Sequence, residues 1–259
     1  MENTTDFAVK TGFKVPVIAL SLYAVASGYL MSLIPLMLNQ YGIDASNASW
    51  LASVFYAGLL VGAVIIEPAV KHVGHRVAFI ACLALFIATI VALPMVPVAW
   101  VWLVARFIAG IAVAGVFVIV ESWLLVGDES SRAKRLGLYM GSLYGGSALG
   151  QLGIGFIGIE GSVPFVVILS MLSAAIMVLM FVPTQQPQSA HSATLSLKQV
   201  AKLNHAAIIG CIVSGLTLGS IYGLMPVELT HREVSQTNLS ALMALVILGG
   251  MAVQTIVLR

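Results

Sequence analysis

Long apolar runs alternate with short polar segments along almost the whole chain. Eight runs stand out, near 15–38, 47–66, 77–97, 100–126, 136–158, 162–183, 206–228 and 239–258. Each is about 20 residues or longer, enough for an α-helix to cross a hydrocarbon core about 30 Å thick. A helix also satisfies its own backbone hydrogen bonds, which lipid cannot do. The pattern therefore predicts an all-α polytopic membrane protein with eight transmembrane helices.

Composition supports a lipid environment. Of the 259 residues, 60% are hydrophobic and only 8% are charged, against about 25% charged in an average soluble domain. Because this number of charges could not cover the surface of a water-soluble domain, we expect the protein to lie in a lipid bilayer. The formal net charge of +2 is small, and we expect no nucleic-acid partner. The first run starts like a cleaved signal peptide, but it continues unbroken through Leu38, which favours a retained span.

Lysine and arginine are distributed unevenly between alternate loops. If the N-terminus is cytoplasmic, the outer loops contain only Arg232. The inner segments then contain Lys10, Lys14, Lys71, Arg76, Arg132, Lys134, Arg135, Lys198 and Lys202. Cytoplasmic loops of membrane proteins carry an excess of these residues. The asymmetry predicts that both termini are cytoplasmic.

A polar linker and an internal repeat divide the chain. The longest polar segment follows the sixth run, so we expect a six-helix bundle over 1–183, a cytoplasmic linker over 184–204 and an incomplete second bundle over 205–259. YLMSLIPLML at 29–38 aligns with SIYGLMPVEL at 220–229, an offset of 191, and Gly58 and Gly249 keep that offset. A constant offset over two spans suggests parallel repeats of six helices.

The loop between the second and third runs contains an unusual concentration of charge. Glu67 precedes Lys71 by four residues, the favourable order for an ion pair on a helix. Gly74, His75 and Arg76 follow directly. Topology and a local ion pair explain most of this cluster.

Two motifs resemble those of the major facilitator superfamily. Gly74-His75-Arg76 is similar to the end of that superfamily's signature between the second and third helices, although Glu67, Lys71 and His75 depart from it. RFIAGIAVAG at 106–115 resembles its fourth-helix pattern of an arginine followed by spaced small residues. RFIAGIAVAGVFVIVESWL and SGLTLGSIYGLMPVEL resemble uncharacterised YcaD-like bacterial permeases. The resemblance implies two six-helix bundles, alternating access and a multi-pass protein of the bacterial inner membrane.

Arg106 is the strongest candidate for a functional residue. It lies within the fourth run, where a charge costs several kcal/mol unless it is paired or reaches water. A structural role, bonding a neighbouring helix, is the alternative. Glu121 follows fifteen residues later on the same side of the helix, about 22 Å along the axis. By resemblance, the first and seventh helices line a central cavity with the fourth. The further candidates for substrate or coupling are Tyr23, Ser27, Tyr29 and Tyr222.

Glycines within the apolar runs predict close helix contacts, and the sequence lacks motifs typical of enzymes and metal sites. Gly110, Gly141, Gly145 and Gly150 are expected to let helices approach closely. We find no enzyme motif, metal-ligand pattern or phosphate-binding loop, so we expect no enzyme activity, no metal and no cofactor.

Secondary transport of an unidentified small-molecule substrate is therefore the predicted function, with proton coupling as a hypothesis. The rival interpretation is a non-transporting membrane scaffold or partner subunit. The repeat offset places Arg259 opposite Pro68. We accordingly expect a second bundle limited to two helices and little activity from this chain alone, unless a homodimer or a separate second half completes it.

Overall fold

The computed structural model describes residues 13–125, 129–184 and 205–257, and every element in these ranges is helical. The elements are α2 (Lys14–Met37), the 3-10 turn η1 (Leu38–Tyr41), α3 (Asn47–Val73), α4 (His75–Met95), α5 (Ala99–Leu125), α6 (Glu129–Phe156), α7 (Val163–Phe181), α9 (His205–His231) and α10 (Gln236–Val257). The predicted all-α class is confirmed. Most of the expected linker, together with Lys10, Lys198, Lys202 and Arg259, lies outside the described residues.

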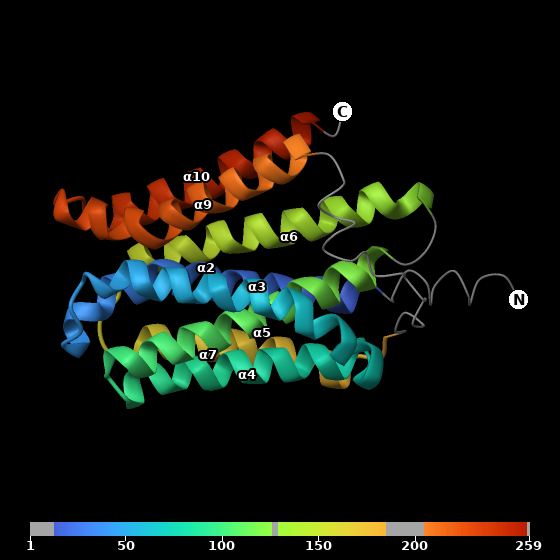
Figure 1. The fold of residues 1–259 in the computed structure, drawn as a ribbon, viewed down its shortest axis with the longest axis horizontal. Coiled ribbons are helices and arrows are strands. Elements are labelled where there is room, and N and C mark those ends of the chain that lie inside the picture. Colours follow the sequence, from blue (N-terminus) through green and yellow to red (C-terminus); the bar gives the residue numbers. More distant parts are fainter. Residues whose placement is uncertain (1–12, 126–128, 185–204, 258–259) are drawn as a thin grey trace, which may run out of the picture.

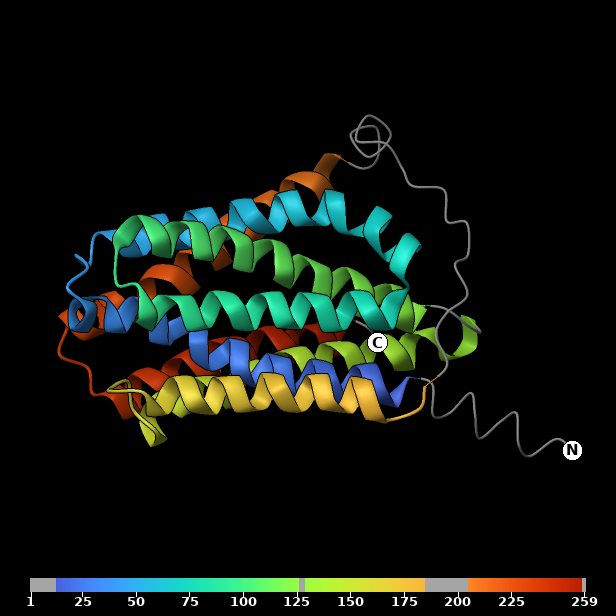
Figure 2. The ribbon, with the colours of Figure 1, turned by 90° about the horizontal axis from the view of Figure 1, so that it is seen from below.

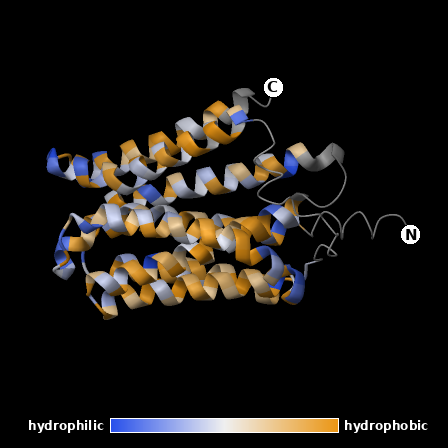
Figure 3. Ribbon diagram, in the orientation of Figure 1, coloured by the Kyte–Doolittle hydropathy of each residue, from blue (hydrophilic) through white to orange (hydrophobic). Residues whose placement is uncertain are grey.

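Seven segments among the described residues are long and apolar enough to cross a membrane. They are Lys14–Tyr41, Asn47–Val73, His75–Met95, Ala99–Leu124, Val163–Phe181, Ile208–His231 and Gln236–Val253. The expected fifth span forms helix α6 but does not meet the same criteria. Its run GSLYGGSALGQLG replaces aliphatic side chains with glycine, serine, tyrosine and glutamine, and it is visibly paler in Figure 3.

The position of α6 explains why it tolerates this polarity. It lies between α2 on one side and α10 on the other, and both contacts are extensive. Figure 1 shows α10 on one side of α6, while α4 and α7 lie at the opposite side of the molecule. Two faces of α6 therefore meet protein rather than lipid, so that helix needs less apolar surface than a lipid-facing one.

The other helices form an antiparallel bundle around α2. That helix contacts α5, α6, α7 and α9, and α5 packs against both α3 and α4. Figure 2 shows α7 along α2, and α4 beside α5. The largest fully buried side chains of the bundle include Tyr23 and Leu33 of α2, Phe79 and Phe86 of α4, and Trp102 of α5.

Glycines set the two closest helix crossings. An added Cβ at Gly110 of α5 would lie 2.1 Å from the Phe55 carbonyl oxygen of α3. At Gly150 of α6 it would lie 2.1 Å from the Val25 carbonyl oxygen of α2. Small residues permit this approach of helix backbones inside a membrane.

Two of the glycines predicted for packing have a different environment. An added Cβ at Gly141 or Gly145 would meet nothing within 4 Å. Gly146, next in sequence, is in close contact, because its Cβ would lie 2.8 Å from Ala24 Cβ. The crossing with α2 is therefore formed by the face of α6 that carries Gly146 and Gly150, whereas Gly141 and Gly145 face open space among the described residues.

Polar side chains also join α2 to α6 and to the loop that follows it. Ser32 Oγ donates a hydrogen bond to Gln151 Oε1 at 2.6 Å, and both residues are fully buried. Tyr29 Oη donates to the Gly158 carbonyl oxygen at 2.5 Å. These bonds fix the position of α6 along α2, because a slip of either helix would leave buried polar groups unsatisfied.

Candidate functional site

Arg106 borders a small cavity near the end of the bundle where α2 and α9 end and α3 and α5 begin. The cavity has a volume of about 30 Å³ and lies among α2, α3, α5 and α9. Its lining includes Ile34, Leu51, Phe55, Tyr56, Arg106 and Tyr222. This volume suffices for about one or two water molecules. Residues of α9 therefore line the same cavity as Arg106, the arginine that the sequence analysis singled out.

The guanidinium of Arg106 has aromatic neighbours but no acidic partner among the described residues. Its Cζ lies 4.1 Å from the centroid of the Phe55 ring. The hydroxyls of Tyr23 and Tyr56 are close enough to interact with its charge. Its Nε is buried without a hydrogen-bond partner, and within the described ranges no carboxylate forms an ion pair with it.

These neighbours compensate the charge only in part. A cation–π contact contributes about 2 kcal/mol when it is desolvated. Removing one ion from water costs several kcal/mol, even after the protein relaxes. An additional negative charge or hydrogen-bond acceptor in the cavity would therefore be strongly attracted to Arg106.

The structure brings only some of the other candidates to this cavity. Tyr222 of α9 lines it. Tyr23 is buried in the core, where its ring contacts Phe86 and Phe117. Ser27, one turn further along α2, is close enough to interact with the Tyr23 hydroxyl.

Two candidates lie elsewhere. Tyr29 is buried and holds the loop after α6 through Gly158. Glu121 is exposed, towards the other end of α5. Neither borders the cavity at Arg106, so the structure gives them no contact with the centre of the candidate site.

A larger crevice adjoins the cavity. It has a volume of about 600 Å³ between α3 and α9, and it shares Ala52 and Tyr56 with the smaller cavity. Tyr56 and Phe55 were not predicted as site residues. Their signal in the sequence is an aromatic pair with one hydroxyl in the middle of an apolar run, which by itself does not distinguish a site from a packed core.

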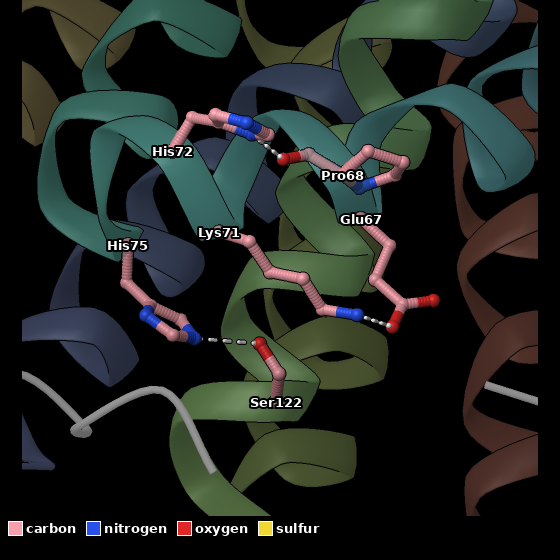
Figure 4. Close-up of polar contacts among 6 residues, drawn as sticks. All are labelled: Glu67, Pro68, Lys71, His72, His75 and Ser122. Carbon is pink, nitrogen blue, oxygen red and sulfur yellow. Dashed lines mark hydrogen bonds and ion pairs between the residues drawn. The ribbon is translucent and has the colours of Figure 1, made fainter. Parts of the chain in front are cut away.

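The charged segment, expected from the sequence to be a loop, is helical on both sides of Gly74, with Glu67 and Lys71 in α3 and His75 in α4. It forms a compact set of polar contacts (Figure 4). Lys71 Nζ lies 3.0 Å from Glu67 Oε1, and both side chains are nearly half exposed. His75 Nε2 is 3.1 Å from Ser122 Oγ of α5. Gly74 joins the two helices with φ +83° and ψ 158°, a conformation essentially restricted to glycine.

Arg76, the second residue of α4, joins this segment to α7. Its Nε donates to the Leu179 carbonyl oxygen, and its Nη2 donates to the Met180 carbonyl oxygen. Both carbonyls belong to the last turn of α7, where backbone acceptors lack intrahelical partners and the helix dipole is negative. The cluster therefore also fastens α4 to α7, beyond its expected effects on topology and ion pairing.

Comparison with known proteins gives a consistent result. The sequence profile of the Major Facilitator Superfamily matches residues 17–259. Proteins called "Uncharacterized MFS-type transporter YcaD" from Salmonella enteritidis PT4, Salmonella paratyphi B and Salmonella newport are each 32% identical over 234 residues. These matches cover 89% of this chain and 61% of each relative. The chain thus spans less than two thirds of the length of the curated relatives it matches.

Proposed function

This chain belongs to the Major Facilitator Superfamily, and on that basis we propose that it moves a small solute by alternating access, as a secondary transporter. It is a multi-pass membrane protein, with seven candidate spans among its described residues. In the proposal, residues 1–183 form one bundle, 184–204 the linker, and α9 with α10 belong to the second bundle. Solute passes between the two bundles.

The observation that carries the proposal is the environment of Arg106. It is a charge inside an apolar helix, without a carboxylate partner among the described residues, beside a cavity that α9 helps to form. Such intramembrane charges are expensive and typically mark solute or ion pathways. Tyr222 supplies a hydroxyl to the same cavity from α9, so both proposed bundles contribute to the site.

We also propose an orientation in the bacterial inner membrane with both termini in the cytoplasm. Figure 1 shows the start of α2, the α3–α4 connection and the start of α6 at the same end of the molecule. Lys71, Arg76, Lys134 and Arg135 lie in these segments. Positive residues favour the cytoplasmic side, which supports this orientation.

Loss of Arg106 tests the transport proposal. We expect Arg106→Ala to reduce solute flux at least tenfold in cells, while the amount of protein in the membrane stays near the wild-type level. Arg106→Lys should restore only part of the flux, because lysine lacks the planar five-donor guanidinium. Arg232→Ala is the matched control, since Arg232 is exposed, pairs with Glu228 and lines neither the cavity nor the crevice.

The rival interpretations predict other outcomes. If Arg106→Ala and wild type support the same flux across a broad solute panel, the chain acts as a membrane scaffold or partner subunit. If Arg106→Ala is absent from the membrane while Arg232→Ala is present, Arg106 is structural. Dissipating the proton gradient tests the coupling hypothesis, and co-purification of two differently tagged copies tests a homodimer.

A further inference from the structure

We infer that the ligand of this site is an amphipathic organic monoanion, whose acidic head pairs with Arg106 and whose apolar tail occupies the crevice between α3 and α9. This inference rests on the proposed function, because it names the class of solute that the same site would take. It is carried by the charge at one end of the site and by the chemistry of the adjoining crevice.

The head position follows from the charge of Arg106. Its Nε is buried without a partner, and among the described residues its charged or polar neighbours are the tyrosines Tyr23 and Tyr56 rather than an acid. A single guanidinium matches a single carboxylate, because its planar donors fit two acceptor oxygens. Tyr56 lines the same cavity, so its hydroxyl can donate a further hydrogen bond to such a group, whereas a cationic head would be repelled.

The tail position follows from the crevice. It begins at Ala52 and Tyr56, which it shares with the cavity at Arg106, so a ligand can reach both spaces at once. Leu60, Ile212, Leu216 and Leu224 contribute apolar side chains to it. The small cavity alone holds about 30 Å³ and the crevice about 600 Å³, so only the crevice has room for a chain of several carbons.

The serine hydroxyls of the crevice are already bonded to their own helices. Ser49 Oγ donates to the Ser46 carbonyl oxygen, Ser53 Oγ donates to that of Ser49, and Ser220 Oγ donates to that of Leu216. None of these donors needs a ligand. A sugar-like ligand would therefore find few free donors in the crevice, while an alkyl or aryl tail would gain from leaving water.

Binding to the purified 259-residue chain in neutral detergent tests the inference. The probe is radiolabelled octanoate, with acetate as a head without a long tail and octylammonium as the same tail with the opposite charge. We expect octanoate to bind at least tenfold more tightly than acetate, a difference of about 1.4 kcal/mol or more. Octylammonium should not compete.

Three variants separate head from tail. Arg106→Gln should weaken octanoate binding at least tenfold, and Arg232→Gln should leave it unchanged and also correct for uptake by micelles. Gly215→Leu fills the crevice without a clash, because an added Cβ there meets nothing within 4 Å. It should weaken octanoate binding and leave acetate binding as it was.

The outcomes distinguish this inference from the transport proposal. Equal octanoate binding by wild type and Arg106→Gln, or effective competition by octylammonium, overturns the inference. If Arg106→Gln does not fold, Gly215→Leu and the octylammonium competition decide. Arg106-dependent flux of a cation or a neutral sugar overturns the inference and keeps the transporter. Arg106-dependent octanoate binding without flux keeps the ligand class and rejects transport by this chain alone.

Discussion

Replacing one glycine of α6 by alanine should destabilise the protein, although alanine is the better helix former. At Gly150 the new Cβ would lie 2.1 Å from the Val25 carbonyl oxygen and 2.7 Å from the Tyr29 nitrogen of α2. The first distance is more than 1 Å shorter than the 3.4 Å at which ordinary contact begins. Because both obstructing atoms are backbone, no side-chain rotation relieves the clash, and the helices must separate.

The magnitude follows from two opposing effects. Overpacking a tight contact costs about 1–3 kcal/mol, and a clash with backbone belongs at the upper end of that range. The higher helix propensity of alanine returns about 1 kcal/mol. We therefore expect Gly150→Ala to lower the free energy of unfolding by about 1–2 kcal/mol.

The same helix supplies a control of opposite sign. At Gly141 an added Cβ meets nothing within 4 Å, so only the propensity effect remains. Gly141→Ala should raise the free energy of unfolding by about 0.5–1 kcal/mol. Both variants are measured as denaturant titrations in detergent, read out by labelling of the buried Cys82 thiol in a Cys211→Ala background. A Gly150→Ala protein as stable as wild type, or a Gly141→Ala protein that loses stability, would refute this account of the crossing.

Three further predictions concern other parts of the bundle. Arg76→Gln removes the charged donor from the last carbonyls of α7 and should lower the free energy of unfolding by about 1–3 kcal/mol. In the same denaturant titration, Arg76→Lys should be intermediate. An unchanged unfolding midpoint would contradict the proposal that Arg76 caps α7. Tyr29→Phe removes the hydroxyl bond to Gly158 and should cost about 0.5–1.5 kcal/mol; an equally stable variant would show that the bond contributes nothing net. Reporter fusions at the N-terminus and in the α5–α6 connection should show both to be cytoplasmic, whereas a periplasmic signal from either would reverse the proposed orientation.

Much of the architecture could be read from local sequence. An apolar run of about 20 residues is stable in lipid as a helix, because a helix satisfies its own backbone hydrogen bonds. The structure has a helix at each of the eight runs. The run that became α6 shows the limit of this reasoning. Its length predicted a span. Its hydropathy is low because α2 and α10 cover two of its faces, and local sequence does not show which helices will pack there.

Arg106 could be singled out from the sequence alone, because the cost of a charge in hydrocarbon is a local property. Its surroundings could not. Phe55 and Tyr56 lie about fifty residues away in sequence and reach Arg106 only because Gly58 and Gly110 bring α3 against α5. Tyr222 reaches the same cavity because α9 packs against α2 and α3.

The helices, the asymmetry of the loop charges and the one costly arginine follow from local sequence, since each depends on neighbouring residues and on lipid. The choice of which face of each helix is covered belongs to the tertiary packing. That choice separated Gly146 and Gly150 from Gly141 and Gly145, and it placed Arg76 on carbonyls of α7 more than one hundred residues away. The rotation of a helix about its axis is set by the helices that pack on it, and nearly uniform apolar runs carry little periodic pattern to fix that rotation in advance.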